Sequence, residues 1–302
     1  MHTRRQFVRS VLAVGGFMTA GCDGDRGRTG GTVPSNRRVD MQDHLNVAAL
    51  VFPGMDQIDL TGPFAVLSRL PDSTLQLVWK DTNPIRDYRG LRLIPDARFA
   101  DARPVDLLVV PGGPGQEEVM EDDAVLSFVR DRAGRARCVF SVCTGALVCG
   151  AAGLLRGRPA TTHWGSIHLL PYFGAVPRKE RVVVDGTYIS AAGLTAGIDG
   201  ALRVAAMLRG EEAAKAIQLD IQYAPEPPFD CGLPERAPPE LVARLTAASA
   251  ELTARRLTTA RRVAAKLNVD AGVPAAGSPT AAKSGQYTGG FPTFSPNTLG
   301  AH

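Results

Sequence analysis

Three nearly unbroken runs of apolar residues constrain the fold of this 302-residue chain most strongly. They are LNVAALVF at Leu45–Phe52, VDLLVV at Val105–Val110 and CVFSV at Cys138–Val142. Strands that are covered on both faces have such continuous runs, whereas strands with one face in water alternate apolar and polar residues. Helix-like patterns at Ile58–Leu70 and Asp122–Arg135 separate the runs. The alternation predicts an α/β fold with a mostly parallel sheet sandwiched by helices.

Shorter signals complete the predicted domain. Leu75–Trp79 alternates like a second strand, and Ile85–Leu93 is predicted to form a hairpin or an excursion at the sheet edge. Asp185-Gly186 lies between two β-rich runs, a pattern that favours a tight hairpin turn. Further helices are predicted at Thr144–Leu154 and at Thr195–Arg209, the second with Thr195 as its N-cap.

The N-terminus has the pattern of an export signal. TRRQF at residues 3–7 resembles the twin-arginine signature, and the apolar stretch Val11–Ala20 is too short to span a bilayer. Ala20-Gly21-Cys22 is similar to the end of a lipoprotein signal, although Thr19 stands where such signals usually carry Leu. Either Cys22 is lipidated or the signal is cleaved nearby with Cys22 incidental. We expect export to the periplasm, with a membrane anchor in the first case.

Composition sets the expected domain limits. We expect a signal at residues 1–22, a flexible tether at 23–44, one catalytic domain at 45–267 and a disordered tail at 268–302. The tether has almost no apolar content, and the tail is rich in Gly, Pro, Ser and Thr. A net charge of +4 is too small to predict nucleic-acid binding.

Three loop motifs follow the three apolar runs and therefore meet at one edge of the predicted sheet. They are Asp59 beyond the first run, Gly112-Gly113 after the second and Cys143 directly after the third. Ligands of open α/β sheets bind beyond the carboxyl ends of the strands. This convergence points to a site at that edge, because a cysteine that only fills the core would not need the other two motifs.

Cys143 stands between a strand and a helix, where a nucleophile would be exposed on a sharp turn. The following helix N-terminus is expected to lower the pKa of its thiol. The N–H of Thr144 and one from Gly112 or Gly113 are expected to form an oxyanion hole. The alternative is an inert buried cysteine, which is common for this residue type.

Other residues that can carry chemistry give weaker signals. The five cysteines include no Cys-x-x-Cys pair, and His163 and His168 are five residues apart, so no metal site is expected. His163 is expected to be a structural histidine, with a pocket donor as the alternative. Cys149 is expected to lie in the core, and Cys231 has no assigned role.

The segment SVCTGALVCGAAGLLRGRPATTHW strongly resembles the nucleophile turn of the ThiJ/PfpI superfamily (class I glutamine amidotransferase-like), specifically its isonitrile hydratase branch. FPGMDQIDLTGPFAVL, VDLLVVPGGPG, AAGLTAGIDGAL and IQYAPEPPF extend the resemblance over residues 45–267. It implies a flavodoxin-like fold, a homodimer, Cys143 as nucleophile, Asp59 as its acidic partner, and Thr144 with the glycine pair as oxyanion donors. Many superfamily members carry His after the cysteine, whereas Thr144 matches the hydratase branch.

The resemblance implies hydration of an isonitrile to an N-substituted formamide, by one soft nucleophile and one carboxyl that donates and then accepts a proton. We expect no cofactor. Asp59, desolvated beside the sulfur, should have a raised pKa, and its alternative role is a helix cap. Glyoxalase-like or deglycase-like activity is a second hypothesis. A ligand-sensing domain like that of arabinose-regulator-type transcription factors is a third, disfavoured because only about 70 residues follow Tyr223.

The segment 239–267 carries an approximate apolar stripe and a basic end. Arg255, Arg256, Arg261, Arg262 and Lys266 crowd its end, and no acidic residue stands between them. A solvated helix face is the expected role, and attraction to an anionic membrane surface is the alternative.

Overall fold

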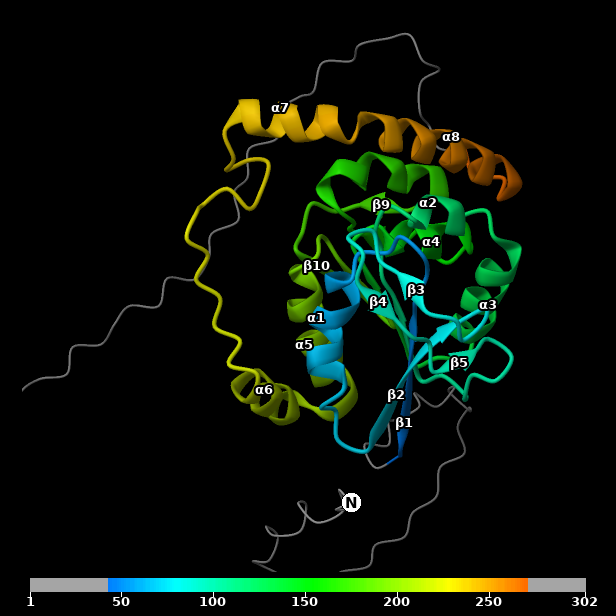
Figure 1. Cartoon of the computed structure of the whole chain (residues 1–302), viewed down its shortest axis with the longest axis vertical. Helices are drawn as coiled ribbons and strands as arrows, with labels where there is room; N and C mark the ends of the chain where they lie inside the picture. Colours follow the sequence, from blue (N-terminus) through cyan, green and yellow to red (C-terminus); the bar gives the residue numbers. More distant parts are fainter. Residues whose placement is uncertain (1–42, 271–302) are drawn as a thin grey trace, which may run out of the picture. The chain divides into compact units, whose positions relative to one another are not determined.

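A seven-stranded sheet forms the centre of the protein, in the order β10-β11-β7-β6-β1-β2-β5. The structure is a computed structural model that describes residues 43–270. The strands of this sheet are β1 (Leu45–Leu50), β2 (Ser73–Trp79), β5 (Ala97–Arg98), β6 (Leu107–Val110), β7 (Cys138–Val142), β10 (Val182–Asp185) and β11 (Tyr188–Ala191). Within this sheet β10 and β11 pair antiparallel and the other pairs are parallel, which confirms the predicted fold class (Figure 1).

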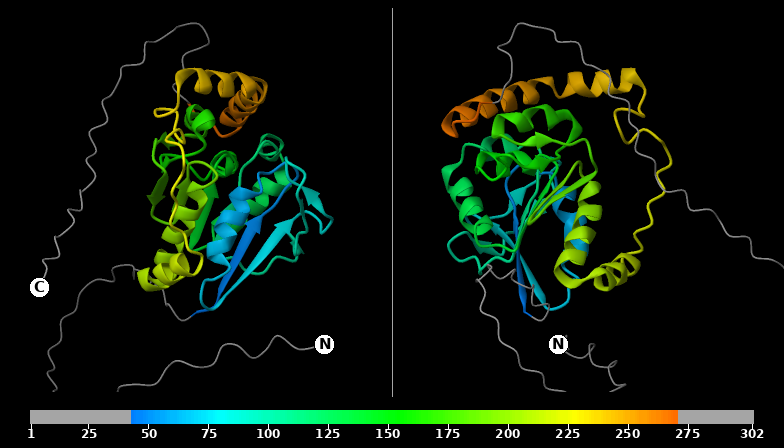
Figure 2. Two further views of the ribbon diagram at one scale, coloured as in Figure 1. Left: turned by 60° about the vertical axis from the view of Figure 1, so that its left-hand side comes forward. Right: turned by 180° about the vertical axis from the view of Figure 1, so that it is seen from behind.

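Helices cover both faces of the sheet (Figure 2). They are α1 (Ile58–Leu67), α2 (Gln116–Val119), α3 (Asp123–Ala133), α4 (Gly145–Ala151), the 3-10 helix η1 (Trp164–Phe173), α5 (Ala196–Arg209), α6 (Glu211–Asp220), α7 (Pro239–Ala248) and α8 (Ala250–Lys266). Helices α1 and α5 pack together, with α5 on β7 and β11, while α3 and α4 pack together on β6 and β7. This arrangement buries β7 between α4 and α5, as its apolar sequence predicts.

Two small sheets lie beside the main one. β3 (Ile85–Arg86) and β4 (Arg92–Leu93) form the predicted hairpin, and β8 (Pro159–Ala160) pairs in parallel with β9 (Val176–Pro177). The hairpin is bonded to the loop after β1, because Tyr88 N–H donates to the Met55 carbonyl at 2.9 Å. The hairpin therefore supports the loop that carries the first predicted site motif.

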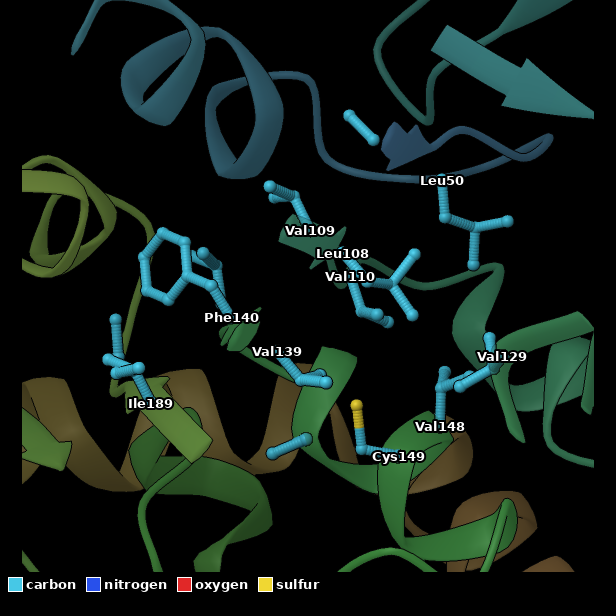
Figure 3. Packing of buried hydrophobic residues seen from close by; sticks show 14 of the residues in the cluster. Leu50, Leu108, Val109, Val110, Val129, Val139, Phe140, Val148, Cys149 and Ile189 are labelled. Atoms are coloured by element: carbon cyan, nitrogen blue, oxygen red, sulfur yellow. The ribbon is translucent and has the colours of Figure 1, made fainter. Parts of the chain in front are cut away.

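The core is continuous across the central strands and the helices on them (Figure 3). Leu50, Leu108 and Phe140 are fully buried, and so is Cys149 on α4, as the sequence predicts. Burying one such large side chain contributes about 1.5–3 kcal/mol. A Cβ at Gly200 of α5 would lie 2.6 Å from the Phe140 ring, so this helix needs a glycine to approach the sheet. The tight packing fixes the strand ends that carry the site.

Some local predictions differ from the structure. Thr195 occupies the N-cap position of α5, but its side chain makes no capping hydrogen bond and instead accepts one from Arg181 Nη2 at 3.4 Å. The basic segment forms two helices, and α8 packs against η1, α2 and α4.

The predicted signal at 1–22 with Cys22, and most of the predicted tether and tail, lie outside the described residues. The domain limits at 45 and 267 stay predictions. Between residues 43 and 270, no helix has both the length and the apolar character that crossing a bilayer requires.

Candidate active site

Cys143 occupies a strained turn between β7 and α4. Its φ of 55° lies in the left-handed region that residues with a side chain rarely adopt. The turn is held on both sides: Cys143 N–H donates to the Ala191 carbonyl at 3.0 Å, and Thr162 Oγ1 donates to the Cys143 carbonyl at 2.7 Å. Such strain persists only where surrounding contacts over-determine it. These contacts keep the side chain at the carboxyl end of the central strand.

The structure brings all five predicted residues of the catalytic site together. The Gly112 N–H donates to Asp59 Oδ2 at 3.1 Å, and the Gly113 N–H donates to Thr144 Oγ1, also at 3.1 Å. Gly113 has a φ of +123°, and a Cβ there would lie 2.2 Å from the backbone nitrogen of Asp56. No larger residue fits at this position. The loop at Gly112-Gly113 (the glycine loop) therefore packs directly against the loop after β1, and its bond to Thr144 connects it to the turn at Cys143.

Asp59 is fully buried, and the thiol of Cys143 lies near enough to its carboxyl to influence its pKa. Burial, and then the charge of Asp56, raise the pKa of Asp59 to about 7, as expected of a desolvated carboxyl. Its Oδ1 has no hydrogen-bond partner among the described residues. Asp59 is not a helix cap, because its Oδ2 bonds Gly112 and the N–H of Ile58 is bonded by Asp56 Oδ1 at 3.3 Å instead. The carboxyl is thus held by the glycine backbone within electrostatic reach of the Cys143 thiol.

The thiol of Cys143 differs from the sequence prediction in two respects. The residue is buried, with 5% of its surface exposed, rather than standing free on its turn. Burial, and then the charge of Asp59, raise the pKa of the thiol well above its usual range, although the Thr144 N–H and the charge of Arg256 act in the opposite direction. Desolvation therefore outweighs the helix N-terminus, whose contribution is typically below about 1 kcal/mol.

The glycine N–H groups are bonded within the site to Asp59 and Thr144. The Thr144 N–H is the predicted oxyanion donor that faces the sulfur. The roles of Thr144, Gly112 and Gly113 as oxyanion donors stay predictions.

Helix α8 contributes a residue that the sequence analysis assigned to a solvated face. Arg256 is buried, and its Nη2 donates to the Gly113 carbonyl at 2.8 Å. Acidic partners come from α2 and from the first turn of α8 itself. Arg262 forms an ion pair with Glu121 of α2, and Arg255 lies 4.0 Å from Glu117 Oε2. Arg255 also pairs with Glu251 of α8 at 2.6 Å. The prediction failed for Arg256 because no local pattern shows that α8 returns to Gly113, 143 positions earlier in the chain.

Asp56 is the second residue that sequence reasoning missed. It is buried, and its pKa is raised chiefly by burial, which the Ile58 N–H and Tyr88 from the hairpin partly offset. Asp56 lies just before α1 and its N-cap Gln57, so helical spacing gives no signal that its carboxyl approaches that of Asp59. Through its charge, Asp56 helps to keep Asp59 protonated.

The other histidine and cysteine that the sequence analysis weighed, His163 and Cys231, supply no group to the proposed chemistry. His163 Nδ1 accepts the Gly165 N–H at 3.3 Å, and burial lowers its pKa, which favours the structural role. Cys231 is exposed. Within residues 43–270 no group of three or more His, Cys, Asp and Glu side chains could hold a metal ion.

Comparison with known proteins identifies relatives of this chain by sequence and by fold. The model of the DJ-1/PfpI family matches residues 45–207. The isonitrile hydratase of Pseudomonas putida is 48% identical over 225 residues, which are 74% of this chain and 99% of that protein. The crystal structure of a ThiJ/PfpI family protein from Pseudomonas syringae aligns with a TM-score of 0.71 at 36% identity, over 77% of this chain and 97% of that one. The HTH-type transcriptional regulator GbdR of Pseudomonas aeruginosa is 31% identical over 42% of this chain but only 35% of its own length.

Proposed function

The chain belongs to the DJ-1/PfpI family, and from this premise we propose that it hydrates isonitriles to N-substituted formamides, with Cys143 as nucleophile and Asp59 as acid and base. The observation that carries the proposal is the electrostatic coupling of the buried Asp59 carboxyl to the Cys143 thiol, in a chain that is 48% identical to an isonitrile hydratase over nearly the whole of that enzyme. On this proposal the protein is a hydro-lyase.

The first half-reaction uses the proton that the Asp59 carboxyl and the Cys143 thiol share. Ionised Asp59 takes the proton of the Cys143 thiol, and the thiolate forms a carbon–sulfur bond with the terminal carbon of R–N≡C. Protonated Asp59 then gives that proton to the same carbon, which leaves a thioimidate, Cys143–S–CH=N–R, and an ionised carboxylate. A group with a pKa of about 7 suits this step, because it exchanges protons readily in both directions near neutral pH.

The second half-reaction consumes one water molecule. Asp59 accepts a proton from the water as the hydroxyl adds to the thioimidate carbon, and it delivers that proton to the nitrogen. The carbon–sulfur bond then breaks, the hydroxyl proton returns to Asp59, and R–NH–CHO leaves. The thiolate and protonated Asp59 are regenerated, so no redox step and no cofactor enter the balance. The Thr144 N–H, which faces the sulfur, is placed to stabilise it as the leaving thiolate.

The two other hypotheses are weaker on specific grounds. The sensor hypothesis finds support in the match to the regulator GbdR, but that match spans only about a third of the regulator. Hydration or deglycation of small carbonyl compounds would use the same thiol. The near-complete match to the hydratase favours isonitriles over both.

A turnover assay tests the proposal. We expect the purified chain to convert an alkyl or aryl isonitrile to its formamide, followed by mass spectrometry, and Cys143→Ala to abolish that conversion. Cys231→Ala, which changes the exposed cysteine, is the matched control and should retain full activity. Turnover of methylglyoxal without turnover of any isonitrile would favour the second hypothesis, and binding without turnover would favour the sensor.

We also propose where and in what form the enzyme works. The TRRQF signature supports export by the twin-arginine pathway to the periplasm, and Ala20-Gly21-Cys22 supports lipidation and a membrane tether. Family resemblance supports a homodimer. A globomycin-sensitive mass shift at Cys22 tests the tether, and light scattering of the purified chain tests the dimer. An unshifted mass would show that Cys22 carries no lipid and that the exported protein is not tethered through it.

A further inference from the structure

Arg256 is a buried cation without a carboxylate partner. Its exposed fraction is 8%, and no ion pair within residues 43–270 includes it. Its hydrogen bonds go to neutral acceptors, the Gly113 carbonyl at 2.8 Å and Ser166 Oγ at 3.5 Å, and its Nε has no partner in the described part of the chain. Because a buried charge is costly unless it is paired, the guanidinium requires a negative charge nearby.

The charged groups around Arg256 identify that partner. Glu117 of α2 acts on it from a distance, but the Glu117 oxygens are engaged by Thr259, at 2.7 Å, and Arg255. His163, the N-cap of η1, also interacts with Arg256, and burial lowers its pKa, which keeps it neutral. The remaining neighbour that can become an anion is the Cys143 thiol, whose charge interacts with Arg256 more strongly than that of Glu117.

The backbone contacts of Arg256 reach the same site. The Gly113 carbonyl accepts from Arg256 Nη2 and, at 3.3 Å, from Thr144 Oγ1, the residue next to the nucleophile. Helix α8 thus holds the glycine loop and places a positive charge beside the sulfur. Arg256 lies beyond the family match, which ends at residue 207, so the common family domain does not supply this charge.

We propose that Arg256 is a positioning residue of the active site: its guanidinium is the counter-charge that stabilises the Cys143 thiolate, and helix α8 is therefore part of the catalytic centre. This inference rests on the proposed function, because the thiolate is the species that attacks the isonitrile during turnover. Burial opposes the thiolate even when Asp59 holds the shared proton, so a counter-charge is needed for the thiolate to persist in a buried site.

The test is the pH profile of Cys143 alkylation by iodoacetamide in the full chain, with peptide mapping to separate Cys143 from the other cysteines. We expect Arg256→Gln to move the midpoint upward by about one pH unit or more, which slows alkylation about tenfold at a fixed pH below the midpoint. Arg256→Lys should restore most of the shift, because it keeps the charge. Arg262→Gln, which breaks the ion pair with Glu121 on the same helix, is the matched control and should leave the midpoint unchanged.

The direction in which the alkylation midpoint shifts distinguishes the loss of the positive charge of Arg256 from a loss of packing by α8. If Arg256→Gln merely released α8, the thiol would become solvated, its pKa would fall and alkylation would become faster. An unchanged or downward midpoint in Arg256→Gln, or an equal upward shift in Arg262→Gln, would overturn the proposal. A wild-type chain that fails to hydrate isonitriles but shows the expected shifts would refute the proposed function and leave the role of Arg256 standing.

Discussion

The backbone N–H of Gly112 donates a hydrogen bond of 3.1 Å to the Oδ2 of Asp59, an acid that lies 53 positions earlier in the chain. This bond joins the loop after β6 to the first turn of α1 and orients the carboxyl. The other oxygen, Oδ1, is buried and has no hydrogen-bond partner within residues 43–270. One oxygen of Asp59 is therefore fixed by the backbone, while the other makes no hydrogen bond in this part of the chain that would compete for an exchanged proton.

Asp59→Asn should separate turnover from thiol reactivity. The variant has no acid to deliver the proton, so we expect kcat/KM for an isonitrile to fall by about 10²-fold or more. The charge of Asp59 raises the pKa of the Cys143 thiol, so its removal should lower that pKa and make alkylation at pH 8 faster than in the wild type. Turnover and alkylation rates are the two measurements. Loss of both together would mean that the substitution had disrupted the site.

The activity should decrease as the pH falls through about 7. The active pair shares one proton between Asp59, whose pKa burial raises to about 7, and Cys143, whose pKa burial raises still further. Below pH 7 the pair binds a second proton on Asp59, no base remains for the thiol, and kcat/KM should drop about tenfold per pH unit. Asp56→Asn should move this acidic limb of the pH profile, the range in which kcat/KM falls, to lower pH. The reason is that the charge of Asp56 raises the pKa of Asp59. A limb at the same pH in both proteins would contradict the assignment to Asp59.

Thr144→Val should weaken both the fold and the activity. The hydroxyl accepts the Gly113 N–H at 3.1 Å and donates to the Gly113 carbonyl at 3.3 Å, so valine leaves a buried N–H unpaired. We expect a loss of about 1–3 kcal/mol in the free energy of unfolding, measured by urea denaturation, together with a lower kcat/KM. Thr144→Ser keeps the hydroxyl and should retain most of both. If the serine and valine variants behaved alike, these hydrogen bonds would not be the cause.

Gly145→Ala should destabilise the domain. A Cβ at Gly145 would lie 2.0 Å from the Val110 carbonyl oxygen, so α4 and the end of β6 would have to separate. We expect a loss of about 3 kcal/mol or more in urea denaturation, although alanine favours a helix by about 1 kcal/mol over glycine. Gly232→Ala, where the new Cβ meets nothing within 4 Å, is the matched control and should change little. A stable Gly145→Ala variant would show that the backbone relaxes at no cost.

The sequence by itself determined the sheet and the position of the nucleophile. Continuous apolar runs at Leu45–Phe52, Val105–Val110 and Cys138–Val142 predict strands that are covered on both faces, and parallel strands bring their carboxyl ends to one edge. Asp59, Gly112 and Cys143 therefore had to approach one another once these runs paired. The motifs that follow the strands also carry the family resemblance, so the chemistry could be predicted with the fold.

Only the tertiary structure decided the electrostatics of the site. The direction of the thiol pKa depends on how completely the turn is desolvated, and the burial of Cys143 depends on how the surrounding elements close around it. Nothing in the local sequence indicates that Arg256 returns to Gly113 across 143 positions, or that Asp56 contributes its charge to Asp59. Local patterns determine which residues form strands and turns, whereas desolvation and charge act through space between residues that only the folded chain brings together.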